Sequence, residues 1–387
     1  MIKILDSTLR EGEQTPGVAF DKHIKIAIAS KLDEIGVDFI EAGHPAVTEE
    51  INGTVKILAN IGLNATIGAH SRLIKSDIDL ALESGVKFLG IFYCVTDERL
   101  EDVFKTDINK AADKIKEMIS YAKSQNSELL IRYTPEDTVR SKYENVITAS
   151  VAAIEGGADI ISIADTTGFM VPGTDRSMYD YVSRLKNDLS SRNLSPMIAV
   201  HCHNDRGLAL ANALDAYRAG ANIIDSSIIG LGERAGIVDT AQLLTTLTLN
   251  FGDSKWDLSK LKDLYDLVSI HSKVALPANY PLMGKNAFTH CAGVHTQAAS
   301  QNPMHYEDIN PELFNRKRKF ALDHMSGLAS LDYAVNLLNI KGIDKDIELD
   351  VLKEIKSIGQ KGRVVELTEL PMLIESVKHH KLHGELE

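Results

Sequence analysis

The chain of 387 residues contains very little cysteine. Cys94, Cys202 and Cys291 are too few and too far apart for a disulfide framework or a CxxC zinc motif, which favours a reducing compartment. The chain also lacks any run near the ~20 apolar residues of a membrane span. Its start shows no basic segment followed by an apolar core and a cleavage site. We therefore expect a cytoplasmic protein that does not enter a membrane.

A surplus of positive charge is missing as well. The 54 Asp and Glu residues outnumber the 42 Lys and Arg residues, which gives a formal net charge of -12. This sign opposes electrostatic capture of nucleic acid or of an anionic membrane surface, so we expect neither partner. Hydrophobic residues make up 44% of the chain, which is typical of a globular protein with a large core.

The sequence does contain a regular alternation of short runs rich in Ile, Val, Leu and Phe with stretches of helical period. This alternation is typical of βα units and a parallel sheet. A doubly wound open sheet is disfavoured, because no GxGxxG turn follows the first run. Eight runs within about 250 residues instead predict a TIM (β/α)8 barrel. The expected strands are 2–6, 39–43, 65–70, 88–94, 129–134, 160–165, 197–203 and 223–230, and the clearest expected helices are 22–35, 77–84, 108–124, 142–156, 178–188 and 208–219.

The alternation stops near residue 252. A mixed segment with Pro277, Pro281 and Pro303 follows, and helical patterns then return near 330–338 and 348–358. We expect a barrel followed by a smaller, mainly helical C-terminal region. The predicted domains are a TIM-barrel catalytic domain over 1–252, a linking subdomain over 253–310 and a helical C-terminal subdomain over 311–387.

Polar residues gather where the expected strands end. Active sites of TIM barrels lie at the C-terminal ends of the strands, so these residues are the first candidates for function. They are Asp6, Arg10, Glu11, Glu41, His70, Arg72, Arg132, Thr134, Glu136, Asp165, Thr166, His201, His203, Asp205, Glu233 and Arg234.

The pair His201 and His203 is the strongest local signal. A strand has a period of two residues, so both imidazoles point to the same face. With one carboxylate from a neighbouring strand they would form a two-His-one-carboxylate metal site with open positions. The candidate carboxylates are Asp6, Glu11, Asp165 and Asp205, and the alternative for the two histidines is a structural, hydrogen-bonded pair.

Arg10 and Arg132 stand where a substrate carboxylate would be held, because the planar guanidinium matches a carboxylate. The alternative is structural ion pairing with Asp6, Glu41 or Asp165, and both roles are compatible. Hydroxyl groups that would assist the same ligand are those of Thr134 and Thr166, although threonine at a strand end is also simply a good strand former.

The segment Asp6–Gln14 resembles the D-x-T-L-R-D/E-G-x-Q signature of the metal-dependent acetyl-CoA:2-oxo acid acyltransferases, the family of 2-isopropylmalate, homocitrate and citramalate synthases. The resemblance continues, in the same order, to about residue 306. The segments that carry it are 164–168, 201–205, 230–234 and 288–295.

This resemblance implies a Claisen-type condensation of acetyl-CoA with a 2-oxo acid, followed by thioester hydrolysis. It implies a divalent metal (Mg2+, Mn2+ or Zn2+) that polarises the keto oxygen, and Arg10 as the residue that stabilises charge developing on that oxygen. The positions that match the family's metal ligands are Glu11, His201 and His203, and those that match its carboxylate-binding residues are Arg132, Thr134 and Thr166.

The resemblance also implies a catalytic base from a second chain. Removal of the weakly acidic methyl proton needs a positioned base, and the matching positions are His295, supported by Glu136 and Tyr306. A site shared between chains implies a homodimer in which the C-terminal region is exchanged over the neighbouring barrel mouth.

Among the possible 2-oxo acids, the resemblance favours 2-oxoglutarate and the product homocitrate, because Ile237 and the segment 12–20 are similar to homocitrate synthases. Two positions depart from the lysine-pathway enzymes: Ile74 aligns with their histidine for the distal carboxylate, and Gly90 aligns with an aspartate. His70 and Arg72 are the candidate substitutes. The alternatives are a 2-isopropylmalate, citramalate or Re-type citrate synthase, a metal-dependent carbon–carbon lyase on the same barrel, and a non-catalytic binding barrel.

Overall fold

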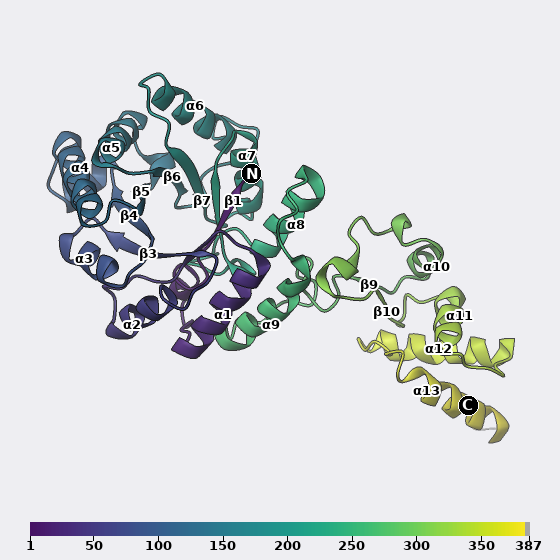
Figure 1. The fold of residues 1–387 in the computed structure, drawn as a ribbon. Coiled ribbons are helices and arrows are strands. Elements are labelled where there is room, and N and C mark those ends of the chain that lie inside the picture. Colours follow the sequence, from purple (N-terminus) through teal and green to yellow (C-terminus); the bar gives the residue numbers. More distant parts are fainter. Residues whose placement is uncertain (384–387) are drawn as a thin grey trace. The chain divides into compact units, whose positions relative to one another are not determined.

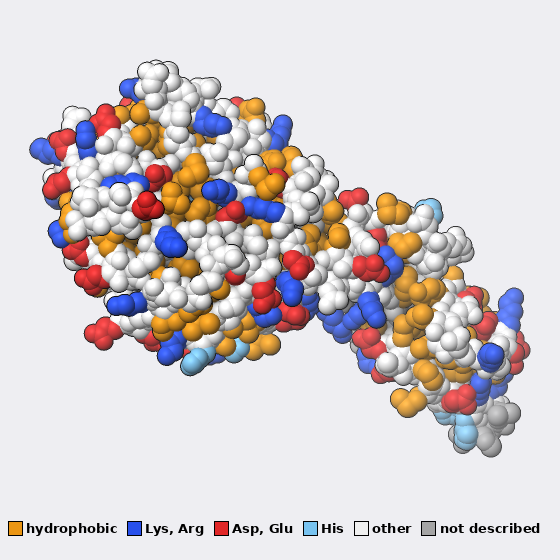
Figure 2. Space-filling view, in the orientation of Figure 1, with side chains coloured by type: hydrophobic (Ala, Val, Ile, Leu, Met, Phe, Trp, Pro, Cys, Tyr) orange, Lys and Arg blue, Asp and Glu red, His pale blue; other side chains and the backbone are white. Residues whose placement is uncertain are grey.

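The computed structural model describes residues 1–383, and its contacts divide the chain into two compact units, Met1–Ala275 and Leu276–Glu387. Unit 1 is a closed barrel of eight parallel strands in the order β1 to β8, which confirms the predicted TIM barrel. The helices of this unit surround the ring of strands (Figure 1). Acidic and basic side chains are interspersed over the face of the molecule in Figure 2. Within residues 1–383, no helix is both long and apolar enough to span a bilayer.

The strands are β1 (Lys3–Asp6), β2 (Phe39–Glu41), β3 (Thr66–Arg72), β4 (Phe88–Cys94), β5 (Leu130–Glu136), β6 (Ile160–Asp165), β7 (Met197–Cys202) and β8 (Ile223–Ser226). The α-helices of unit 1 are α1 (Lys22–Ile35), α2 (Glu49–Leu58), α3 (Lys75–Glu83), α4 (Ile108–Gln125), α5 (Tyr143–Gly156), α6 (Met178–Ser190), α7 (Ala209–Arg218), α8 (Thr240–Phe251) and α9 (Leu261–Ser272).

Helix α1 shows why the local sequence fixes these bounds. The side chain of Asp21 accepts hydrogen bonds from the backbone N–H groups of His23 and Ile24, which caps the first turn. Gly36 ends the helix in the left-handed region at φ 93°, where a side chain would be strained. Between these signals Ile28 and Leu32 are buried against the barrel. The predicted helix 22–35 is confirmed at both ends.

The strand register places polar residues above an apolar floor. Gly90 of β4 is paired with His70 of β3 on one side and with Arg132 of β5 on the other, so these three residues share one layer of the barrel. The layer nearer the amino ends of the strands is apolar and is formed by Leu5, Phe39, Phe88, Ile160, Ala199 and Ile223. The site therefore opens toward the carboxyl ends of the strands.

Unit 2 is mainly helical, as expected. Its short strands β9 (Thr289–His290) and β10 (Lys319–Phe320) pair in parallel, and its helices are α10 (Gly293–Gln301), α11 (Leu328–Leu337), α12 (Lys345–Gln360) and α13 (Leu370–His383). Leu331, Val351, Ile355 and Ile374 lie in a separate apolar core.

The domain bounds differ from the predicted ones. Lys255 forms an ion pair with Asp38, and the backbone N–H of Asp257 donates to the carbonyl of Ile35, so the chain beyond residue 252 stays attached to the barrel. The predicted boundary after residue 310 falls between β9 and β10, which pair with each other inside unit 2.

Candidate metal and substrate site

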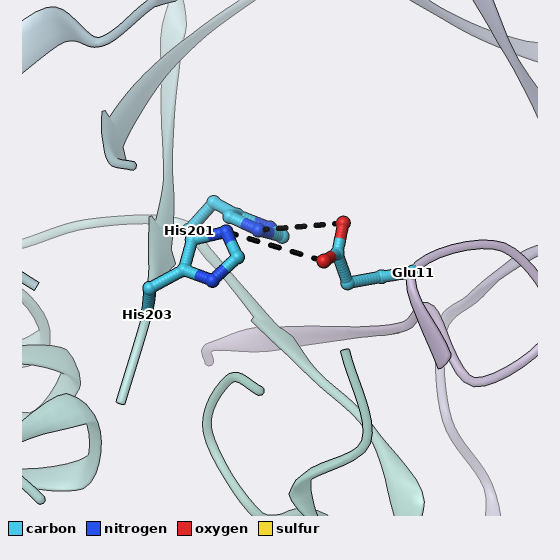
Figure 3. Close-up of side chains that lie close together, drawn as sticks. All are labelled: Glu11, His201 and His203. Carbon is cyan, nitrogen blue, oxygen red and sulfur yellow. Dashed lines mark ion pairs between the residues drawn. The ribbon is translucent and has the colours of Figure 1, made fainter. Parts of the chain in front are cut away.

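Glu11, His201 and His203 lie together at the carboxyl end of the barrel. The two histidines come from the end of β7 and the residue after it, and Glu11 comes from the loop after β1. One ligand atom from each of the three lies within 4.8 Å of the others. The Nε2 atoms of His201 and His203 are each 4.0 Å from a carboxylate oxygen of Glu11 (Figure 3). All three side chains are buried.

The other three candidate carboxylates are engaged elsewhere. Asp6 accepts hydrogen bonds from the backbone of Thr8 and from the hydroxyl of Thr240. Asp165 accepts from the backbone N–H groups of residues 169 and 170, and Asp205 is paired with Arg234. Among the four carboxylates that the sequence left open, the structure brings Glu11 to the histidine pair.

The protonation states of this cluster suit a divalent cation. Burial alone would raise the pKa of Glu11, but Arg10 and then His201 lower it below the usual value, so the carboxylate is ionised. Burial lowers the pKa of His203 to about 3, so its imidazole is neutral at pH 7. The Nδ1 atom of His201 lies 2.9 Å from Oδ2 of Asp225, which leaves Nε2 toward Glu11. Two imidazoles and one carboxylate fit a divalent cation such as Zn2+ or Mn2+.

A series of ion pairs lies next to the cluster and joins Glu11, Arg10, Glu41, Arg132 and Asp225 in that order. Arg10 donates from Nε to Glu41 at 2.6 Å and from Nη1 to Glu11. Arg132 donates from Nη2 to the other oxygen of Glu41 at 3.3 Å and from Nη1 to both oxygens of Asp225 at 2.9 Å. Although burial would raise the pKa of Glu41, the arginines hold it well below its usual range. Both arginines therefore form structural ion pairs, which was their alternative role. Of the three partners expected for this role, Glu41 pairs with both arginines, and the other partners are Glu11 and Asp225.

A cavity of about 180 Å³ adjoins the cluster. The predicted residues that line it are Arg10, Glu11, His70, Arg132, Thr134, Glu136, Thr166, His201 and His203. The lining residues that the sequence analysis did not assign to the substrate are Gln14, His44, Phe92, Ser162, Ala164 and Glu233. Of these, His44 comes shortly after the end of β2, so it could have been included among the polar candidates at strand ends.

Arg72, a predicted substrate residue, and Ile74, the position that aligns with the family's histidine, do not line this cavity. The guanidinium of Arg72 donates to Asp77 at 2.6 and 3.1 Å. Ile74 directly precedes α3, forms no side-chain capping bond, and is 41% exposed. His70 instead lies in the cavity wall, where its ring stacks on Phe92 with centroids 4.6 Å apart. His70 therefore lines the cavity, whereas Arg72 and Ile74 do not.

Gly90 lies directly under the cavity wall. A Cβ atom at this position would be 3.2 Å from Cδ2 of His70 and 3.4 Å from Oε1 of Glu41. The contact with His70 is tighter than an ordinary van der Waals contact, so glycine at this position gives the His70 ring its room against β4.

Comparison with known proteins agrees with this architecture. The family model described as HMGL-like matches residues 1–268, and the one described as homocitrate synthase post-HMGL domain-like matches residues 282–363. The chain belongs to the HMGL-like family. Curated relatives named homocitrate synthase include one from Pyrococcus horikoshii, 43% identical over 92% of this chain and 94% of the relative. Another, from Sulfolobus acidocaldarius, is 39% identical over 97% of this chain and 79% of the relative.

Solved structures confirm the fold of the HMGL-like unit. An HMG-CoA lyase from Bacillus subtilis superposes with a TM-score of 0.60 at 22% identity, covering 71% of this chain and 95% of that one. The carboxyl transferase domain of pyruvate carboxylase from Rhizobium etli gives a TM-score of 0.55 at 16% identity, covering 70% and 47%. At these identities the likeness concerns the barrel alone.

The predicted catalytic base His295 and its supporting residue Tyr306 are neighbours in the segment 282–363 of this HMGL-like chain. The ring centroids of His295 and Tyr306 are 4.1 Å apart, and both side chains are exposed on unit 2. Glu136 belongs to unit 1, where it lines the cavity. Burial raises the pKa of Glu136 above its usual value, and Arg99 lies 3.6 Å away.

Proposed function

We propose that this chain is a homocitrate synthase that condenses acetyl-CoA with 2-oxoglutarate and then hydrolyses the thioester to release CoA and homocitrate. The observation that carries this proposal is the cluster of Glu11, His201 and His203 beside a cavity with two arginines in its wall. The relatives named homocitrate synthase, which match the chain over more than nine-tenths of its length, support the choice of reaction and of 2-oxo acid.

Glu11, His201 and His203 are the residues that would hold a divalent cation. When bound there, the cation supplies Lewis-acid polarisation of the keto group and orients the 2-oxo carboxylate. Arg10 is held in place by Glu41 and Glu11 through Nε and Nη1. Within residues 1–383 no oxygen pairs with its Nη2, so Nη2 is free to stabilise negative charge developing on the keto oxygen.

The remaining cavity residues hold the substrate carboxylates. The hydroxyl oxygen of Thr166 accepts from the backbone N–H of Asp137 at 3.0 Å, so its own proton is free for a substrate oxygen. Thr134 lines the same cavity and assists. Arg132 lines the cavity as well. Both of its Nη groups bond to protein carboxylates, and Nε, which has no hydrogen-bond partner within the described residues, is the donor that it has left for a substrate oxygen. His70 contacts the end of the 2-oxo acid that lies farthest from its keto group.

Deprotonation of the acetyl methyl group is assigned to His295, with Glu136 and Tyr306 in support. In this proposal His295 reaches the barrel of a second copy of the chain. Exposed apolar side chains flank His295 on unit 2, and Val294, Met304 and Met325 are 71%, 74% and 58% exposed. This surface is what an exchanged homodimer would cover. The predicted cytoplasmic location stays a prediction.

The test is to follow free thiol while the protein is incubated with acetyl-CoA, Mg2+ or Mn2+ and a panel of 2-oxo acids. We expect CoA release with 2-oxoglutarate above that with 2-oxoisovalerate, pyruvate and oxaloacetate, and homocitrate as the product by mass spectrometry. Glu11→Gln should abolish the release. Absence of CoA release with every 2-oxo acid would refute the proposal, and a preference for another acid would replace the substrate.

A further inference from the structure

We propose that Asp225 is a positioning residue that sets which ring nitrogen of His201 is free for a cation and that holds Arg132 with the same carboxylate. This inference rests on the proposed cation site. Asp225 lies on β8, is fully buried, and does not line the cavity. It therefore acts through the two residues that it contacts.

The hydrogen bonds of Asp225 determine the tautomer of His201. Oδ2 lies 2.9 Å from Nδ1 of His201, and Arg132 donates to both carboxylate oxygens at 2.9 Å. An ionised carboxylate accepts hydrogen bonds and donates none, so Nδ1 of His201 must carry the proton. In the neutral imidazole Nε2 is then unprotonated, and its lone pair is available beside Glu11.

The second histidine of the pair has no such support. Within residues 1–383, Nδ1 of His203 is buried and has no hydrogen-bond partner. Of the two imidazoles, the structure thus fixes His201 alone through a carboxylate. Asp225 also closes the chain of charges that runs from Glu11 through Arg10, Glu41 and Arg132 back to His201 (residues 10, 11, 41, 132, 201 and 225). The side chain of Asp225 thus contacts both Arg132 in the cavity wall and His201, a candidate metal ligand.

Replacement by asparagine separates these roles with little change of volume. Asp225 faces two donors, Nδ1–H of His201 and Nη1 of Arg132. An amide has one oxygen and one NH2 group, so its NH2 group must face at least one of these donors. If the amide oxygen takes the place of Oδ1, the NH2 group faces His201, which must then shift its proton to Nε2 and lose the lone pair needed for a cation. If the oxygen takes the place of Oδ2, it accepts from both residues, but without the negative charge that strengthens these hydrogen bonds, and the NH2 group faces Arg132.

The test measures the Mn2+ affinity of metal-free protein from the EPR signal of free Mn2+. We expect Asp225→Asn to weaken binding about 10- to 100-fold relative to the wild type. The matched control is Asp159→Asn, because Asp159 accepts from the backbone of Ile131 and pairs with Lys123 at the opposite ends of the strands. The control should bind Mn2+ within about twofold of wild type. Equal affinity of a folded Asp225→Asn protein would overturn the inference, whereas a wild type that binds no Mn2+ would refute the proposed cation site instead.

A second measurement needs no variant at position 225. The imidazole 15N resonances of the metal-free wild type report the tautomer, and the signal of His201 is assigned by its loss in His201→Asn. We expect Nδ1 protonated and Nε2 unprotonated. A spectrum in which His201 carries its proton on Nε2 would overturn the inference even if Asp225→Asn does not fold.

Discussion

Arg132 offers a direct test of the buried charge chain, because its side chain is 2% exposed and faces two fully buried carboxylates, Glu41 and Asp225. Arg132→Met keeps an unbranched side chain and removes the charge. Removal of one partner from a buried ion pair costs about 3–5 kcal/mol, since the other charge stays buried without compensation. Glu41 keeps Arg10 and Asp225 keeps His201, so we expect the lower end of this range, about 3 kcal/mol.

The assay is urea unfolding followed by the fluorescence of Trp256. Trp256 is the single tryptophan of the chain and is buried in unit 1, so its signal reports the barrel. Lys262→Met serves as the control, because Lys262 forms an i,i+4 pair with Asp266 on the surface of α9 and its loss should cost less than about 1 kcal/mol.

A double variant separates charge from packing. Arg132→Met combined with Asp225→Asn removes one of the two carboxylates that lose Arg132 as a partner, so it should be less destabilised than the sum of the two single variants. A loss of less than about 1 kcal/mol in Arg132→Met alone would refute the view that these carboxylates depend on Arg132.

Three further predictions follow from the same contacts. Burial raises the pKa of Asp6 to about 6, so the folded state keeps a proton that the unfolded chain loses near pH 4. The contribution of Asp6 to stability should therefore fall as pH rises from about 4 to about 6, so the wild type should lose stability relative to Asp6→Asn in denaturation measured across that range. Gly90→Ala should raise the KM for the 2-oxo acid several-fold and lower stability by about 1 kcal/mol, because the new methyl group presses on His70; unchanged KM values would contradict this. In mixtures of Glu11→Gln and His295→Ala proteins, exchanged dimers should restore about a quarter of the wild-type sites, as CoA release measures, whereas sites within one chain would give no recovery.

The barrel was predictable because its βα rhythm is local. The strands 88–94 and 160–165 and the helix 22–35 are predicted at the bounds that the structure has, since apolar runs and end signals coincide there. Helix α2 was not among the expected helices. Its sequence EEINGTVKIL contains Asn, Gly and Thr, which weaken the helical pattern, and the cap from Thr48 to the backbone of Ile51 starts it nevertheless.

The sequence predicts those site residues whose spacing or motif indicates their role. The strand period places His201 and His203 on one face, and the resemblance selects Glu11. Asp225 has no such signal, because it is a lone acidic residue inside the apolar run of β8 and its importance depends on which side chains of β5 and β7 reach it. Arg72 was a candidate for the substrate because it follows the expected strand 65–70. In the structure it is the last residue of β3, and its guanidinium donates to Asp77 in the first turn of α3.

The most direct test of the central claim is a crystal structure of the protein grown with Mn2+ and 2-oxoglutarate, with anomalous scattering recorded to locate the metal. We expect an anomalous peak bonded to Glu11, Nε2 of His201 and Nε2 of His203, with the 2-oxo acid in the cavity beside Arg10 and Thr166. A metal bound at other side chains, or 2-oxoglutarate bound away from this cluster, would contradict it.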